Sequence, residues 1–303
     1  MKWIKKGLIF NSPGKKSWAL THAAVPLTKK VDDDIFRIYF SMRDKKNRAS
    51  TAYIEVNITD PQKILYLTEN PILSPGELGT FDDNGVTASS LVDYQEKTFL
   101  YYIGWNSGGN VLYHTSIGLA ISHDGGKSFQ KYSKGPIMDR TTSEPYFCSN
   151  PFVLIENGTW KMWYISFVKW IIYEGKPKPY YHIKYAESVD GINWKREGIV
   201  CIDFKNDKEW SISRPCIIKE NNLYKMWYSF CGELSYRIGY AESSNGVDWK
   251  RRDDVVGIDV SSNGWDSDMI EFPYIFDSID TRYMLYCGNG FGKTGFGYAI
   301  LDK

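Results

Sequence analysis

Short stretches in which apolar and polar residues alternate recur along the chain, and each is followed by a turn sequence. The clearest is residues 184–196, where the alternation leads to Asp-Gly and then to a tryptophan. Residues 239–251 repeat this pattern with Asn-Gly, and residues 118–129 are a looser copy. A period of two predicts strands, and the turn pairs predict hairpins because glycine and asparagine adopt positive φ at little steric cost.

Two further strands precede each of these hairpins. The second strand of each unit is rich in aromatic residues, with copies at residues 36–40, 99–103, 160–164, 224–228 and 282–286. The first strand is entered through a proline in four units, at Pro26, Pro151, Pro215 and Pro273, and begins near residue 87 in the other. Proline is tolerated at a strand's first residue, since its missing N–H removes no ladder bond there.

The strands group into five units spaced by about 50 to 65 residues, and in the first four an outer strand is expected after the hairpin turn. Third strands are expected at residues 50–56, 116–122, 182–188, 237–243 and 295–301. Outer strands are expected at residues 64–73, 129–138, 194–201 and 249–258. The fifth unit has none of its own, but residues 3–9 match residues 194–200 and would complete it.

This organisation predicts an all-β fold. We expect a five-bladed β-propeller of four-stranded antiparallel blades, with the last blade completed by the N-terminal strand so that the ring closes and its edges are covered. No linker or low-complexity tract divides the units, so residues 1–303 should form a single domain. A two-sheet sandwich is the alternative, but it predicts neither the period nor the N-terminal match.

The composition of the chain argues against several classes of binding partner. With 37 basic and 36 acidic residues, the chain has no charge excess that would draw it to nucleic acid or an acidic membrane. No apolar run approaches the roughly 18 residues of a membrane span, and the N-terminus does not read as a signal peptide. The five cysteines lack paired spacing, which favours free thiols in a reducing cytoplasm. The four histidines are scattered, so we expect no metal and no cofactor.

The segments that lead into the first strands should converge at one end of the propeller axis, where ligand sites form. These leading segments carry His22, Asp82, Asp83, Glu144, Arg214, Asp266, Asp268 and Glu271. The ends of the second strands add Arg43, Asp44 and Trp105. Carboxylates beside aromatic rings suit a sugar, whose C–H faces stack on rings while its hydroxyl groups bond to charged groups.

The five units, the Ser-x-Asp-Gly-x-x-Trp turns and the acidic leading segments resemble the five-bladed propeller glycosidases. These are the arabinanase/xylosidase, invertase/levansucrase and mannoside phosphorylase families. The resemblance covers nearly the whole chain and implies a carbohydrate or glycoside substrate, with hydrolysis as the leading expectation. Asp124, Asp190 and Asn245 belong to the turns, so we expect them to be structural.

In the arabinanase-like families, carboxylates from the first three blades serve as base or nucleophile, as orienting group and as acid. The resemblance implies that Asp83 is the second-blade group and Glu144 the third-blade acid, and we expect Glu144 or Asp83 to be the proton donor. Glu271 is a further catalytic candidate because of its place in the last leading segment. The first leading segment has no carboxylate between Trp18 and Pro26. Substrate contacts are expected from His22, Arg43, Asp44, Trp105, Arg214 and Asp268.

The missing first-blade carboxylate leaves other reactions open. Phosphate can be the nucleophile, as the mannoside phosphorylase family suggests, and His22, Arg43 and Arg214 could hold it. The same cations could hold a nucleotide sugar during glycosyl transfer, and a non-catalytic glycan-binding propeller is a further alternative. Structural roles also compete, since Asp83 could cap a turn and Arg214 could form an ion pair between blades.

Overall fold

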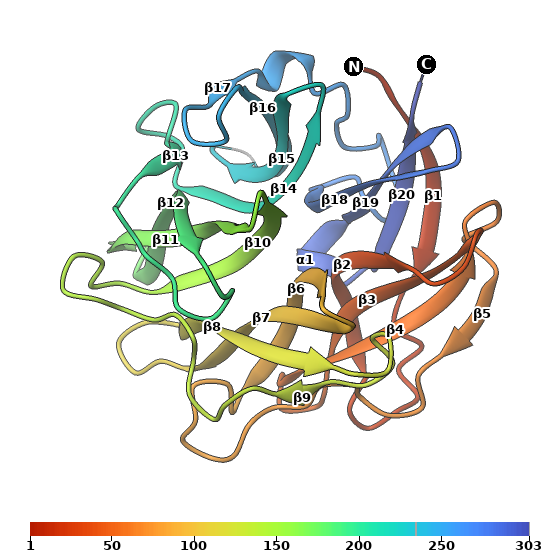
Figure 1. Ribbon diagram of the computed structural model, residues 1–303, viewed down its shortest axis with the longest axis horizontal. Coiled ribbons are helices and arrows are strands. Elements are labelled where there is room, and N and C mark those ends of the chain that lie inside the picture. Colours follow the sequence, from red (N-terminus) through yellow and green to blue (C-terminus); the bar gives the residue numbers. More distant parts are fainter. Residues whose placement is uncertain (234, 303) are drawn as a thin grey trace.

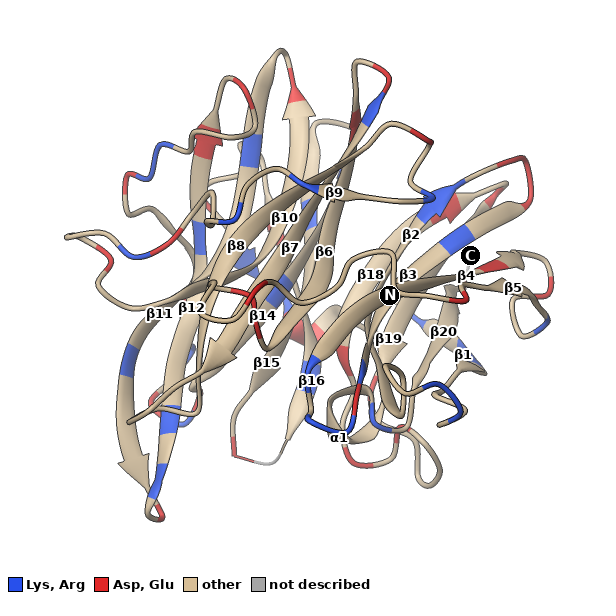
Figure 2. Ribbon diagram, turned by 90° about the horizontal axis from the view of Figure 1, so that it is seen from below, with Lys and Arg blue, Asp and Glu red and all other residues tan. Residues whose placement is uncertain are grey.

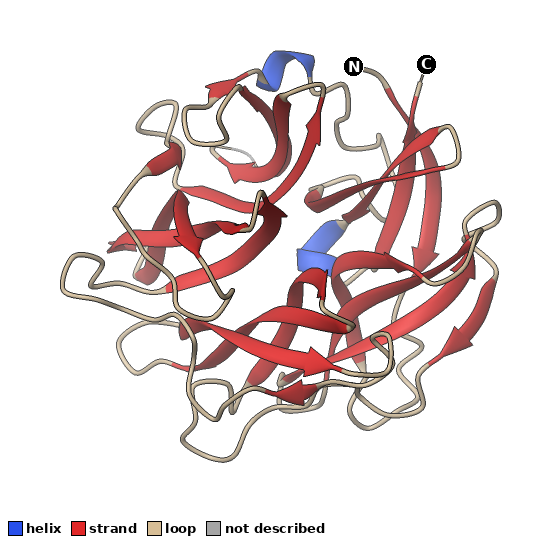
Figure 3. Ribbon diagram, viewed as in Figure 1, coloured by secondary structure: helices blue, strands red, loops and turns tan. Residues whose placement is uncertain are grey.

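The repeated units form groups of strands around a common axis in the computed structural model (Figure 1). The structure describes residues 1–233 and 235–302. Nearly all of its regular structure is β (Figure 3). Within the described ranges, the only helical turns are the 3-10 turn Asp253–Val255 and the short α1 (Asn289–Gly292).

In residues 1–233 and 235–302, twenty strands alternate with turns. Their bounds are β1 Trp3–Phe10, β2 Thr21–Lys30, β3 Ile35–Arg43, β4 Ala49–Asn57, β5 Ile64–Leu67, β6 Gly85–Tyr94, β7 Lys97–Ser107, β8 Tyr113–Ser122, β9 Gln130–Lys131, β10 Cys148–Glu156, β11 Thr159–Tyr173, β12 Lys176–Ser188, β13 Val200–Ile202, β14 Ser211–Glu220, β15 Leu223–Cys231, β16 Tyr236–Ser243, β17 Lys250–Arg251, β18 Glu271–Ser278, β19 Thr281–Cys287 and β20 Phe296–Leu301.

The strands pair into three sheets of four, eight and eight strands. Each eight-stranded sheet consists of two antiparallel groups of four, β2–β5 with β6–β9 and β10–β13 with β14–β17, joined by one parallel pair. Those junctions are Ala49 opposite Gly85 and Tyr181 opposite Ser211. The inner strands β2, β6, β10, β14 and β18 contact one another in cyclic order. The face at which these five strands begin is the leading face.

The N-terminal strand completes the last sheet, as the sequence match predicted. β1 pairs antiparallel with β20, from Trp3 opposite Leu301 to Phe10 opposite Phe296. The two ends of the chain therefore lie side by side in the order β1-β20-β19-β18 (Figure 1). Without β1, the edge of β20 would be open to pairing with another chain.

The outer strands are much shorter than expected. β9 and β17 have two residues each, and β13 covers only Val200–Ile202. After β5 ends, the chain pairs with β4 again only at an isolated bridge between Leu73 and Thr51. Proline and glycine interrupt these segments, at Pro71 and Gly135-Pro136 for example, and proline has no N–H to give to a ladder.

A β-bulge recurs in every inner strand and corrects the position expected for the prolines. They lie within the strands and follow a bulged residue, rather than beginning the strand. The bulged residues have left-handed backbone, with φ of 56° at Val25, 43° at Asn150, 53° at Arg214 and 56° at Phe272. β6 has the corresponding register shift at Ser89 without a proline. Because the bulge already interrupts the ladder, proline removes no hydrogen bond there.

The glycine-containing turns after the third strands form hydrogen bonds with the preceding group of strands. Asp190 closes its own turn by accepting from the backbone N–H groups of Ile192 and Asn193, which confirms a structural role for that side chain. The turn carbonyl then accepts from a buried ring of the preceding group. These contacts are Tyr39 Oη to Gly126 O (2.7 Å), Tyr101 Oη to Gly191 O (2.8 Å) and Trp163 Nε1 to Gly246 O (2.8 Å).

The contacts also correct the alignment of the second unit. Tyr101 makes the contact that Trp163 makes, so residues 98–102, rather than 99–103, correspond to residues 160–164. Gly191 is required at its turn because φ is 72° and a Cβ atom would lie 2.7 Å from the Tyr101 hydroxyl.

Candidate functional site

Acidic residues of the leading segments take part in a contact that recurs around the ring. In the second group, Asp82 is 1% exposed and accepts from the Tyr102 hydroxyl at 3.0 Å and from Lys131 Nζ at 2.6 Å. Tyr102 lies on β7 and Lys131 on the outer strand β9. The carboxylate therefore ties the leading segment to the second and outer strands of its own group.

Glu144 occupies the same place in the third group. Its carboxylate is buried and accepts from the Tyr164 hydroxyl at 2.9 Å, and Lys184 Nζ and Arg196 Nη1 each lie 3.3 Å away. Ser166 adds a fourth, longer contact at 3.4 Å. The structure thus places the residue expected to be the third-blade acid in a fully engaged network.

The remaining groups show how regular this network is. In the last group, Asp266 accepts from the Tyr286 hydroxyl at 3.0 Å and from Lys5 Nζ of β1 at 2.7 Å. In the fourth group the network is extended, with contacts from Arg251 to Glu209 and Asp253 and from Tyr228 to Asp253.

The first group lacks both the carboxylate and the tyrosine that form this contact in the other groups. Phe40 stands where the others have tyrosine and packs against Phe10 and Phe296, at ring-centroid distances of 4.9 and 5.3 Å. A phenylalanine has no hydroxyl to donate, so a buried carboxylate there would have no tyrosine partner. The first group therefore lacks the carboxylate of the leading segment and also the tyrosine that would bond to it.

Arg214, a predicted substrate contact, bonds to two other inner strands. Its side chain is fully buried, and its guanidinium donates to the Ser89 carbonyl, to Ser89 Oγ at 3.0 Å and to the Pro26 carbonyl at 3.2 Å. These acceptors belong to the second and first groups, so Arg214 links three inner strands. Burial lowers the pKa of the guanidinium, although a cation with this reference pKa stays charged.

Three other predicted residues lie in a turn, at an exposed position and within strand β7. Asp44 accepts from the N–H groups of Lys46 and Arg48 and from Arg48 Nε, and these contacts lower its pKa against the opposing effect of burial. Asp268 is exposed. Trp105 is half-buried and lies opposite Gly85. A Cβ atom on residue 85 would lie 2.1 Å from the Nε1 atom of Trp105, so the ring packs directly on this glycine.

Asp83 has one engaged and one free oxygen. Oδ2 accepts from the N–H of Gly79 at 2.9 Å, which is the turn-capping contact considered above. Oδ1 is buried and has no hydrogen-bond partner in residues 1–233 and 235–302.

His22, Arg43 and Lys293 form a cationic cluster on the leading face. Burial, together with Arg43 and Lys293, lowers the pKa of His22 to about 4, so the imidazole is neutral at pH 7. Arg43 donates to Asn47 Oδ1 at 3.0 Å, and neither Arg43 nor Lys293 has a carboxylate partner in the described part of the chain. Lys293 was not predicted, although it follows the glycine-rich segment 289–292.

Glu271 is the one predicted carboxyl group that is buried away from any cation in the described structure. It begins β18 opposite Cys287 and is 1% exposed. Oε1 has no hydrogen-bond partner among the residues described. Burial raises the pKa of Glu271 well above its usual value, because an isolated carboxylate is poorly solvated in an apolar interior.

A chain of hydroxyl groups lies near Glu271. Tyr236 Oη is 2.8 Å from Tyr181 Oη and 2.8 Å from Ser211 Oγ. Burial is the main cause that raises the pKa of both tyrosines. α1 lies near the centre of the ring (Figure 1), where Phe291 packs edge-on against Tyr236. The site thus combines a buried carboxyl group whose pKa is raised with a pair of tyrosine hydroxyls and a serine hydroxyl.

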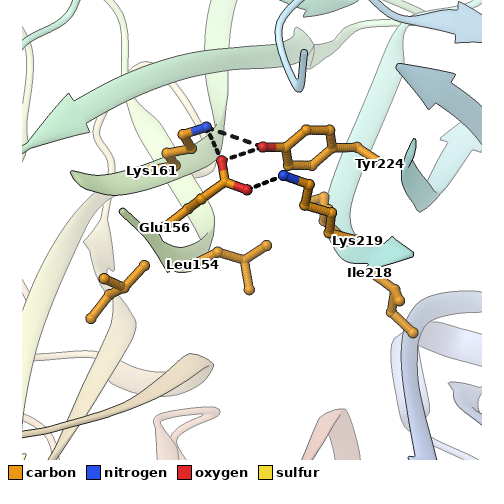
Figure 4. A pocket seen from close by; sticks show the side chains of 8 residues that line it. Leu154, Glu156, Lys161, Ile218, Lys219 and Tyr224 are labelled. Carbon is orange, nitrogen blue, oxygen red and sulfur yellow. Dashed lines mark hydrogen bonds and ion pairs between the residues drawn. The ribbon is translucent and has the colours of Figure 1, made fainter. Parts of the chain in front are cut away.

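A cavity of about 310 Å³ on the opposite face belongs to a structural contact. Glu156, at the end of β10, accepts from Lys161, Lys219 and Tyr224 (Figure 4), and these hydrogen bonds lower its pKa to about 2. Glu220, which holds the corresponding place in the fourth group, likewise pairs with Lys225 of its own group and with Arg282 of the last group. Near the end of β6, Asp93 pairs with Lys29 of the first group. The contact is therefore a recurring ion pair between groups.

General features place few further limits on partners. Lysine and arginine are interspersed with aspartate and glutamate over the molecule (Figure 2). Across the described residues, no group of three or more His, Cys, Asp or Glu side chains is arranged to hold a metal. All five cysteines are free and buried, as predicted. The described chain contains no helix with the length and apolar character of a membrane span.

Comparison with solved structures identifies the fold as that of the propeller-type glycoside hydrolases. A thermostable family-43 glycoside hydrolase superposes with a TM-score of 0.70 at 18% identity, covering 94% of this chain and 90% of that one. A protein from a study of the GH130 family of mannoside phosphorylases gives 0.70 at 14%, covering 99% and 94%. The Bombyx mori GH32 β-fructofuranosidase gives 0.63 at 13%, covering 93% and 61%. The three families expected from the sequence are thus represented among proteins of this fold.

No family model matches the sequence. The chain belongs to the same family as two uncharacterized proteins of Mycobacterium tuberculosis. MT1551 of strain CDC 1551 is 41% identical and Rv1502 of strain H37Rv is 40% identical, each over the whole of both chains.

Proposed function

We propose that this protein is a carbohydrate-active enzyme that cleaves or transfers a glycosyl group, with Glu271 as the proton donor. The observation that carries the proposal is a buried carboxyl group on the leading face of a glycosidase-type fold, with Oε1 unpartnered among the described residues and a pKa that burial raises. A raised pKa lets a carboxylic acid donate a proton near neutral pH. Glu144 and Asp82, by contrast, have structural roles in this proposal.

Hydrolysis is the first candidate reaction. Glu271 donates its proton to the leaving oxygen as the C–O bond breaks, and water adds to the sugar while a base takes the water's proton. Asp83 is the carboxylate proposed for that step, because its Oδ1 has no partner in the residues described. Trp105 supplies a ring near Asp83 on which a sugar face can stack.

Phosphorolysis is the second candidate, and the cationic cluster favours it. Arg43 and Lys293 lack carboxylate partners within the described ranges, and the neutral His22 near them can donate or accept a hydrogen bond. Arg43 can bind phosphate oxygens in a bidentate manner. The phosphate would attack the sugar directly, so only Glu271 would be required as an acid. The phosphate of a nucleotide sugar would be held by the same cations.

The proposal also includes the organisation of the chain. We take the five four-stranded groups to be five propeller blades in a single domain, residues 1–303. The closed order of contacts between the inner strands supports this assignment. A cytoplasmic location accords with the five free thiols.

A panel of aryl and natural glycosides, incubated with and without phosphate, tests these reactions. Release of free sugar in both conditions supports hydrolysis, whereas sugar phosphate formed only with phosphate supports phosphorolysis. Activated sugar donors with acceptor sugars test transfer. A panel without turnover, together with measurable glycan binding, would refute the enzyme and favour a glycan-binding protein.

A further inference from the structure

A second cavity, of about 380 Å³, lies between the third and fourth groups. Its walls come from β11, β12 and residues 203–209, the segment that leads into β14 (Figure 1). The volume falls in the range of small-molecule sites, about 300 to 1,000 Å³. Neither Glu271 nor the cationic cluster lines it, so it is distinct from the site described above.

His182 lines this cavity and has a buried, unused acceptor. The residue is 8% exposed, and its Nδ1 lies 3.0 Å from Asp203 Oδ1. A carboxylate can only accept, so Nδ1 carries the proton and Nε2 of the neutral ring has a free lone pair. Burial lowers the pKa of His182 and keeps it neutral, although Asp203 opposes this effect. Nε2 is buried without a hydrogen-bond partner in the described chain.

In the fourth group, an arginine stands at the position that corresponds to His182. His182 and Arg237 each lie three residues before the Tyr-Ala-Glu-Ser stretch of their strands. Arg237 pairs with Asp259 at 2.8 Å, as His182 pairs with Asp203, and its Nη1 also donates to the carbonyls of Tyr236 and Asp268. The larger guanidinium thus uses several donors, whereas the smaller imidazole leaves one nitrogen unused beside an open cavity.

The walls match a neutral ligand with many hydroxyl groups. Phe204 lies nearly parallel to the His182 ring, with centroids 6.0 Å apart and an interplanar angle of 24°. Tyr180 adds a second ring, with Lys169 Nζ 4.6 Å from its centroid. Asn206 and Asp207 supply polar groups beside these rings. Aromatic surface and polar groups of both charge signs suit a saccharide better than a simple anion or cation.

We propose that this cavity is a saccharide subsite in which a sugar hydroxyl donates to Nε2 of His182. The inference rests on the proposed carbohydrate-active function and adds a place where a sugar unit remote from the cleaved bond binds. An enzyme with such a subsite should prefer substrates long enough to fill it, because binding energy away from the reacting bond can be used in catalysis.

The test uses the full chain labelled with ¹⁵N on histidine, of which there are only four. Mono-, di- and oligosaccharides are titrated, with the Nε2 signal of His182 and calorimetric binding as readouts. We expect at least one sugar to shift that signal and to bind about tenfold more weakly to His182→Arg, which copies the fourth group and fills the cavity. Phe204→Ala should weaken the same binding, whereas the exposed control Glu77→Ala should leave it unchanged.

The outcomes separate the two proposals. Sugar binding at His182 without turnover of any glycoside would support the subsite and refute the enzyme. Turnover in the wild type with an unchanged KM for long and short substrates in His182→Arg would refute the subsite alone. A His182 signal that no saccharide shifts would overturn it as well. Thermal unfolding of His182→Arg is the folding control, and Phe204→Ala tests the cavity independently if that variant does not fold.

Discussion

Glu144 and Glu271 are both buried carboxyl groups on the leading face, and their surroundings are opposite. Glu144 is 5% exposed and has four donors around it, two of them cationic. Glu271 is 1% exposed, and its Oε1 has no donor within the described residues. A buried carboxylate surrounded by cations is fixed in place, whereas one buried alone becomes a neutral acid. Partners, rather than burial, therefore distinguish a structural acid from a candidate for chemistry.

The largest effect is expected from Glu271→Gln. Glutamine has nearly the same shape but no acidic proton, so glycosyl cleavage should fall by at least about 100-fold. Initial rates on the best glycoside of the panel measure this change, and circular dichroism checks the fold. Glu271 would not be the proton donor if the variant kept more than about a tenth of the wild-type rate.

Removing Glu144 should reduce stability instead. Glu144→Ala leaves Lys184 and Arg196 near a buried space without their carboxylate, and breaking such a pair costs about 3 kcal/mol. Urea denaturation measures the free energy of unfolding, with exposed Glu77→Ala as the matched surface control. An unchanged free energy with lost activity would reverse the roles assigned to the two glutamates.

The recurring acid–tyrosine contact could be predicted only in part. Asp82, Glu144 and Asp266 each precede their tyrosine partner by 20 residues, and Phe40 stands where the acid is also missing. That spacing was present in the sequence. The cations were harder to predict, because Lys131 lies 49 residues from Asp82 and Lys5 comes from the other end of the chain.

The strand repeat and its closure by β1 could be predicted because alternation and turn residues act locally. The position of Arg214 could not, since it depends on a bulge that turns one side chain across the axis toward Ser89 and Pro26. His182 was missed for a related reason. Its significance appears only when its unused nitrogen is compared with the occupied Arg237.

Stability should depend on pH through Glu271. Its pKa is raised in the folded state, so the unfolded chain loses this proton first as pH rises. Above the ordinary value of 4.5, the wild type should therefore lose stability relative to Glu271→Gln, by up to about 1.4 kcal/mol per pH unit, until the folded carboxyl ionises. Urea denaturation of both proteins between about pH 4.5 and 8 measures the difference. A constant difference across this range would mean that Glu271 has an ordinary pKa.

The smallest difference in stability is expected between two buried tryptophans, one with and one without a hydrogen-bond partner for its indole N–H. Trp163 Nε1 donates to the Gly246 carbonyl, whereas Trp227, which packs against Trp3, has no partner for Nε1 in the described chain. Both rings are fully buried, so substitution by phenylalanine removes similar apolar surface from each. Trp163→Phe should cost about 1 kcal/mol more than Trp227→Phe, because only the former loses a hydrogen bond between groups. Equal losses of unfolding free energy in urea would show that the contact to the turn adds no stability beyond packing.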